Sequence, residues 1–89
     1  MTANSLIDLS LEEIARGYQP GVLPWMKADK PKEWNEMIAL EKKINDEAVK
    51  EDVEGLKETL RRYKVLIQIM VKKFRTPKGE SGNLFNQGG

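Results

Sequence analysis

The amino-acid sequence predicts an all-α protein built as a three-helix arrangement. It has a short N-terminal capped helix, a long antiparallel helical hairpin and a flexible C-terminal tail. Apolar residues recur at steps of three and four along the second half of the chain, which is typical of amphipathic helices. Charged residues make up 33% of the 89 residues and aromatic residues 7%, a balance that favours a soluble helical protein over a sheet. A chain of this length forms one hydrophobic core, so we expect a single helical domain over residues 1–76.

A capping box marks the start of the first predicted helix. Ser10 and Glu13 have the spacing at which each side chain accepts a hydrogen bond from the other residue's backbone amide. Gly17 offers a stop, so we predict a helix over residues 11–18 that is about 12 Å long. Residues 6–7 are apolar and form either an extra helical turn or an extended apolar strap.

Residues 18–30 are predicted to form a loop, because Pro20-Gly21 and Pro24 interrupt regular structure. Pro20-Gly21 fits the two central positions of a type II turn, where glycine supplies the positive φ. The apolar side chains of this loop are expected to pack over one end of the helical core. The alternative is that this segment is an exposed docking site, since Trp and Met are enriched at interfaces. Under this alternative, Trp25 and Met26 are candidate interface residues.

Two long helices are predicted after the loop. Pro31 suits the first turn of a helix over residues 31–49, and Asp52 is a good N-cap for a helix over residues 52–75. The apolar stripes of the two segments differ by about a quarter turn, so one continuous straight helix would not keep one buried face. We therefore predict a tight antiparallel hairpin. Glycines and polar residues dominate residues 77–89, which predicts a flexible tail.

The composition argues against catalysis. Neither cysteine nor histidine occurs, which removes disulfides, thiol nucleophiles, the commonest general base and the commonest metal ligand. The carboxylates near the hairpin turn do not have EF-hand spacing, and the glycines form no phosphate-binding loop. Glu41 is expected to pair with a Lys or Arg of the last helix. We predict a non-enzymatic protein with no cofactor, metal or small-molecule site.

Targeting and membrane signals are also missing from the sequence. The first thirteen residues lack the basic segment of a signal peptide, and the longest apolar run is far shorter than the ~20 residues of a membrane span. We therefore predict a cytoplasmic location without membrane attachment.

The last predicted helix has a main apolar stripe at steps of three and four, formed by Val53, Leu56, Leu60, Tyr63, Ile67, Met70 and Phe74. A second apolar surface, formed by Val65, Leu66 and Ile69, lies roughly opposite this stripe. An eight-residue first helix covers only part of the groove between the two long helices. The second apolar surface is covered either by the first helix and the loop or by another chain. We hypothesise a protein–protein interaction or assembly module that self-associates as a homodimer through the last helix, or that binds another helical protein.

The charge distribution supports one alternative function. Residues 33–56 carry eight acidic and three basic side chains (−5), whereas residues 57–78 carry eight basic and one acidic (+7). The simplest interpretation is an acidic helix lying beside a basic one. The alternative is a nucleic-acid-binding accessory protein that contacts phosphates, although no helix-turn-helix spacing is present. The candidate contacts are Arg61, Arg62, Lys72, Lys73, Arg75 and Lys78.

Overall fold

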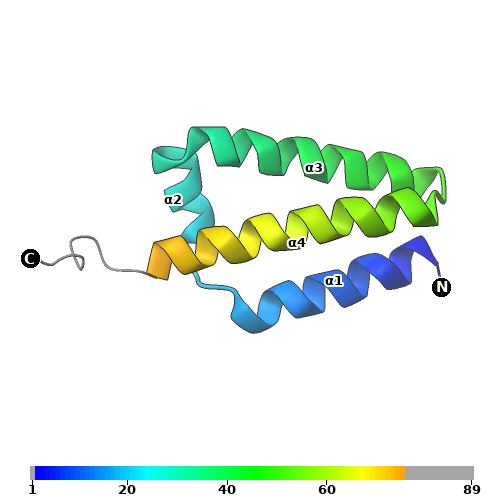
Figure 1. The fold of residues 1–89 in the computed structure, drawn as a ribbon, viewed down its shortest axis with the longest axis horizontal. Coiled ribbons are helices and arrows are strands. Elements are labelled where there is room, and N and C mark those ends of the chain that lie inside the picture. Colours follow the sequence, from blue (N-terminus) through cyan, green and yellow to red (C-terminus); the bar gives the residue numbers. More distant parts are fainter. Residues whose placement is uncertain (1, 76–89) are drawn as a thin grey trace, which may run out of the picture.

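The computed structural model describes residues 2–75, and every regular element in this part of the chain is a helix. The four helices are α1 (Ala3–Gly17), α2 (Val22–Asp29), α3 (Pro31–Val49) and α4 (Val53–Arg75) (Figure 1). The all-α class predicted from the sequence is confirmed. The predicted tail over residues 77–89, which includes Lys78, lies outside the described residues.

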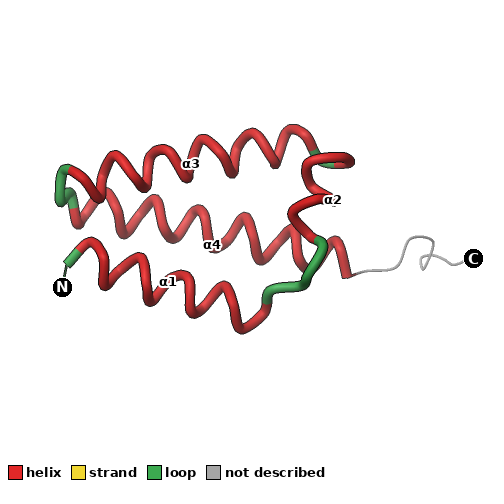
Figure 2. The backbone as a smooth tube through the Cα atoms, turned by 180° about the vertical axis from the view of Figure 1, so that it is seen from behind, coloured by secondary structure: helices red, strands yellow, loops and turns green. Residues whose placement is uncertain are grey.

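Helix α4 is the centre of the fold. In Figure 1 the helices α1 and α3 flank it on either side, with α1 parallel to α4 and α3 antiparallel. Both α1 and α3 pack directly on α4, and the short helix α2 packs against α3 and α4. Figure 2, seen from behind, shows that α2 crosses the bundle at the end where α4 has its C-terminus. One face of α4 is therefore covered by α2 near its C-terminus.

Helix α1 begins at Ala3, so the predicted start at residue 11 is wrong. The Thr2 side chain caps the helix by accepting a hydrogen bond from the Ser5 amide at 3.2 Å. Ser10 lies inside the helix, on the same face as Ala3, because their spacing equals about two turns. Packing of this face on α4 overrides the local capping signal, and residues 6–7 form helix rather than a strap. The fifteen-residue helix is about 22 Å long instead of about 12 Å.

Helix α2 lies within the predicted loop, which is the second correction. Pro24 is its third residue, a position where a missing amide hydrogen leaves no helical hydrogen bond unmade. The predicted turn before it is present: Gly21 has φ 93° and ψ −9°, and the Val22 amide donates to the Gln19 carbonyl at 3.2 Å. The turn directs α2 back across the core.

The helical hairpin agrees closely with the sequence prediction. Helix α3 has the predicted bounds, with a proline in its first turn, and α4 starts one residue after its predicted cap. Asp52 Oδ1 accepts a hydrogen bond from the Gly55 amide at 3.1 Å, and Glu51 makes the turn with φ 53°. A Cβ atom at Gly55 would lie only 2.8 Å from Glu47 Oε2, so the glycine leaves room for this buried carboxylate.

Two apolar clusters form the core. The first joins α2, α3 and the C-terminal half of α4 and contains Val22, Met26, Met37, Ile67, Met70 and Val71. The second joins α1, α3 and the N-terminal half of α4 and contains Ala3, Ile44, Leu56 and Leu60. Val22 and Met26 are both 0% exposed, so the expectation that this segment packs over one end of the core is confirmed. Met26 is a core residue and not a candidate for an interface.

A candidate interaction groove and the outer face of α4

A groove lies between α1 and α3, with α4 as its floor. It arises because both helices pack on α4, while α1 has no extensive packing against α3 within the described residues. The groove contains a cavity of about 230 Å³. Its apolar lining comes from three helices: Ile7, Leu11, Ile14, Ile44, Leu60 and Tyr63. We call this feature the α1–α3 groove.

The apolar side chains of the groove are buried on its floor and exposed on its α1 wall. Leu60 on the floor is only 4% exposed, whereas Leu11 on the α1 wall is 51% exposed. Ile14 and Tyr63 are half-buried between these extremes. An apolar floor with an exposed apolar wall is the kind of surface that an amphipathic helix covers.

Tyr63 and Glu41 form the principal polar contact of the groove. The Tyr63 hydroxyl donates a hydrogen bond to Glu41 Oε2 at 2.9 Å and so links α4 to α3. Burial, followed by the hydrogen bond and the charge of Glu41, raises the pKa of the Tyr63 hydroxyl well above its ordinary value. The expectation that Glu41 pairs with a Lys or Arg of the last helix is wrong, because its hydrogen-bond partner on that helix is Tyr63.

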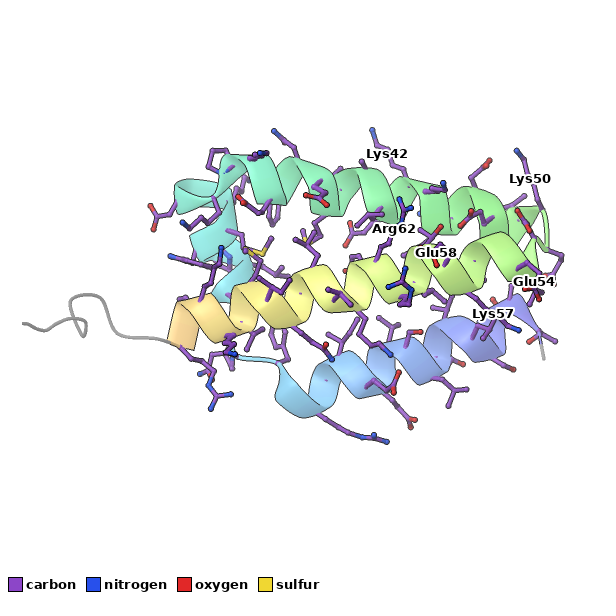
Figure 3. All side chains as sticks on the ribbon, in the orientation of Figure 1. Lys42, Lys50, Glu54, Lys57, Glu58 and Arg62 are labelled. Carbon is purple, nitrogen blue, oxygen red and sulfur yellow. The ribbon has the colours of Figure 1, made fainter. Side chains whose placement is uncertain are left out.

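Acidic side chains lie on α1 just outside the groove. Beyond Leu11, the surface of α1 continues into a shallow area lined by Asp8 and Glu12. Glu41 lines the groove itself, whereas Asp8 and Glu12 lie outside it on the adjoining surface of α1. On the opposite side Lys42 projects from the edge of α3 away from α4, so it does not face the groove (Figure 3).

The outward face of α4 carries the second candidate surface. Val65 and Ile69 lie one turn apart and are 40% and 45% exposed. Counting 100° per residue puts them roughly opposite Leu60 and Tyr63, the residues of α4 that line the groove. Leu66, which the sequence grouped with them, packs against the first core cluster and is half-buried. We call the surface formed by Val65, Ile69, Arg61, Arg62 and Lys73 the outer α4 patch.

The remaining predicted interface residue, Trp25, packs at the edge of the first core cluster. Its ring packs on Phe74 with a centroid distance of 5.2 Å, and the Lys30 ammonium lies 5.9 Å from the indole centroid. Trp25 is half-buried in this position. The structure therefore places Trp25 and Met26 together at the α2 end of the bundle, and Val65 and Ile69 on a separate, exposed surface.

Several basic side chains of α4 have acidic partners. Arg61 Nη2 and Arg62 Nε contact the same oxygen of Glu58, at 2.6 and 3.2 Å, and both hydrogen bonds lower the pKa of that carboxyl. Lys64 Nζ lies 2.8 Å from Glu13 Oε1, a contact between α4 and α1 that lowers the pKa of Glu13. The basic charge of α4 is thus partly balanced by carboxylates of α4 itself and of α1.

The last turn of α4 keeps a basic character. It holds Lys72, Lys73 and Arg75, and all three are exposed. The sixth predicted nucleic-acid contact, Lys78, lies outside the described residues. Of the candidate contacts, the structure therefore gathers three at the end of α4 and pairs Arg61 and Arg62 with Glu58.

The groove was not predicted from the sequence. Its floor residues belong to the main apolar stripe of α4, which the sequence assigns to the core. The exposed wall depends on Leu11, and Leu11 faces the groove only because α1 begins at Ala3 and runs alongside α4. A signal was available in the spacing of Ile7, Leu11 and Ile14, but the capping box at Ser10 divided that stripe.

The fold defines the class of protein: an all-α protein of four helices within residues 2–75, with an apolar groove beside its central helix. No protein-family model matches the chain, and neither a curated protein nor a solved structure matches it. Among the described helices, none combines the length and the apolar character that crossing a membrane requires. The described residues also contain no cluster of three or more His, Cys, Asp or Glu side chains arranged to hold a metal ion.

Proposed function

We propose that this protein is a non-enzymatic protein–protein interaction module that self-associates. The observation that carries the proposal is the α1–α3 groove, an apolar cavity whose wall residue Leu11 is half exposed to solvent. Exposed apolar surface next to a cavity is costly in water and is typical of a protein-binding site. The outer α4 patch supplies a second exposed apolar surface on the same chain.

The chain provides few groups for catalysis, and this supports a binding role. With no histidine or cysteine, acid–base chemistry would have to use carboxylates, lysine or tyrosine. The tyrosine in the groove holds its proton more tightly than an ordinary tyrosine, because burial and Glu41 raise its pKa. Such a hydroxyl is a poor general base at neutral pH, so the groove suits binding better than proton transfer.

Sedimentation velocity across a range of low to high micromolar concentrations tests the proposal. We expect the weight-average sedimentation coefficient to rise with concentration, and to rise less for Leu11→Arg, which places a long charged side chain at the groove wall. The matched control is Val49→Arg. Val49 is 84% exposed at the end of α3 and belongs neither to the groove lining nor to the adjoining area of α1. A protein that stays monomeric at every concentration contradicts self-association.

A second candidate function is nucleic-acid binding, and the basic last turn of α4 favours it. Lys72, Lys73 and Arg75 place three positive charges in the last turn of α4, and positive side chains suit phosphate contacts. A fluorescence titration with a labelled RNA or DNA oligonucleotide at low salt tests it, with Lys73→Gln and Arg75→Gln as the variants. Absence of binding at low salt rules this function out, because phosphate contacts strengthen as salt falls.

A cytoplasmic location belongs to the same proposal. The support is compositional, since a third of the residues are charged and suit an aqueous compartment. Fractionation of cells that express the tagged protein tests it, and recovery of the protein in a membrane or secreted fraction contradicts it.

A further inference from the structure

We infer that the chain assembles head to tail, with the outer α4 patch of one copy docked in the α1–α3 groove of the next. This inference rests on the proposed self-association and adds which two surfaces meet. In such an assembly two different surfaces meet, so further copies can add at either end, whereas a two-fold dimer is closed.

The geometry of α4 is the first argument. Leu60 and Tyr63 face the groove, whereas Val65 and Ile69 face outward on roughly the opposite side of the same helix. One molecule therefore presents a concave apolar site on one face and a convex apolar patch on the other. Surfaces on opposite faces cannot satisfy each other within one copy, but they can do so between successive copies.

Shape supports the same pairing. A cavity of about 150 Å³ is enough to hold a benzene-sized molecule, and the groove holds about 230 Å³. Val65 and Ile69 are aliphatic and one turn apart, so they project together from a single helix face. The groove extends at least from Ile7 to Ile14, roughly 10 Å along α1, and one helical turn of about 5 Å fits within that length.

Charge complementarity is the third argument. Glu41 lines the groove itself, and Asp8 and Glu12 lie beyond Leu11 on the adjoining outer surface of α1, so all three charges on this side of the molecule are acidic. The outer α4 patch carries Arg61, Arg62 and Lys73, and Glu58 offsets one of these charges, so the patch keeps a positive balance. Pairing two grooves would place carboxylates against carboxylates. Pairing two patches would place cations against cations unless the Glu58 side chains moved between them.

The contact should be weak, because only two aliphatic side chains enter the cavity and the surrounding charges remain exposed. A contact of this kind belongs to the small, transient class of interfaces and depends on ionic strength. We expect assemblies that grow with protein concentration and dissociate as salt is added.

Complementation between two singly blocked variants tests the inference. Leu11→Arg blocks the groove and leaves the patch intact, whereas Ile69→Glu blocks the patch and leaves the groove intact. Both positions are about half exposed, so neither change disturbs a fully buried residue. Circular dichroism and urea unfolding of each variant confirm that it is folded. Val65→Glu is a second patch variant in case Ile69→Glu fails this check.

Sedimentation velocity is then measured on each variant alone and on their equimolar mixture. We expect the wild-type protein to form a concentration-dependent series of species. Each variant alone should require at least about tenfold higher concentration to associate. The mixture should form a species of two chains and no larger one, because one patch and one groove remain usable. The matched controls Val49→Arg and Val49→Glu change a position that is 84% exposed and lies outside both sites, and they should assemble like the wild type.

Other outcomes overturn the inference in distinguishable ways. If Ile69→Glu associates like the wild type and Leu11→Arg does not, two grooves pair with each other, and self-association stands while head-to-tail assembly fails. If Leu11→Arg associates normally and Ile69→Glu does not, two patches pair, and head-to-tail assembly fails again. If the wild-type protein is monomeric throughout, the proposed self-association itself fails.

Discussion

Replacing Met26 by alanine tests the placement of α2 in the core. Sequence patterns allow Met26 to be an exposed docking residue, whereas the structure buries it completely beside Val22 and Met70. Removing a buried methionine side chain loses its transfer free energy and leaves a cavity that the surroundings only partly fill. Such substitutions cost about 2–5 kcal/mol, and we expect about 3 kcal/mol here because the site is fully enclosed.

This loss is large for a chain of this size. A domain with about 75 ordered residues has a free energy of unfolding of roughly 4–11 kcal/mol at 0.05–0.15 kcal/mol per residue. Met26→Ala should therefore remove a large fraction of the total stability. Urea unfolding followed by far-UV circular dichroism measures the change. Val49→Ala, at a position 84% exposed, should change stability by no more than about 0.5 kcal/mol.

Protein concentration separates the core role of Met26 from an interface role. If Met26 packs within one chain, the loss of stability is the same at low and high protein concentration. If it packs between chains, the urea midpoints of wild type and variant converge on dilution. A loss below about 1 kcal/mol, or one that disappears on dilution, would refute the burial of α2 described here. Met26→Leu keeps most of the volume and should cost less than about 1.5 kcal/mol.

Three further predictions concern turns, caps and the groove. Gly21→Ala should destabilise by about 1–2 kcal/mol in urea unfolding, because φ is 93°, a backbone conformation that L side chains rarely adopt. Asp52→Ala should cost about 1 kcal/mol through loss of the cap on α4, and an unchanged urea midpoint would contradict that role. Tyr63→Phe should cost about 1–2 kcal/mol, since Glu41 loses its hydrogen-bond donor. The raised pKa of Tyr63 means that the folded protein holds this proton more tightly than the unfolded chain. Its contribution to stability is therefore present below the ordinary tyrosine pKa of about 10 and is lost as pH rises above it. Urea midpoints measured between pH 8 and 11 should fall more for the wild type than for Tyr63→Phe, and parallel curves would contradict this linkage.

The surface ion pairs of Glu58 and Glu13 predict a loss of stability as pH falls, whereas Tyr63 predicts a loss as pH rises. Arg61 and Arg62 lower the pKa of Glu58, and Lys64 lowers that of Glu13. A carboxyl whose pKa is lower in the folded state favours folding above its unfolded pKa and loses this effect as pH falls through the folded value. The side chains of Glu58 and Glu13 are both 48% exposed to solvent, so salt should weaken the effect.

The candidate site was only partly predictable from the sequence. Helical periodicity identifies Val65 and Ile69, because the seven positions of the main apolar stripe of α4 fix which face of the helix is buried and which is exposed. The groove was missed, since its open wall depends on how far α1 extends and on which helix it packs against. Trp25 and Met26 show the same limit: an apolar loop segment has no periodicity that reveals whether it turns inward or outward.

The sequence by itself determined the class of this protein, the bounds of α3 and the position of the hairpin turn. These features depend on local chemistry: a proline at a helix start, the Asp52 cap and apolar residues at helical spacing all act within a few residues of each other. Tertiary structure decided the start of α1, the helical state of residues 22–29 and the existence of the groove. In each case packing against α3 or α4 outweighed a local signal, because burying several apolar side chains contributes more free energy than one capping box or one proline position.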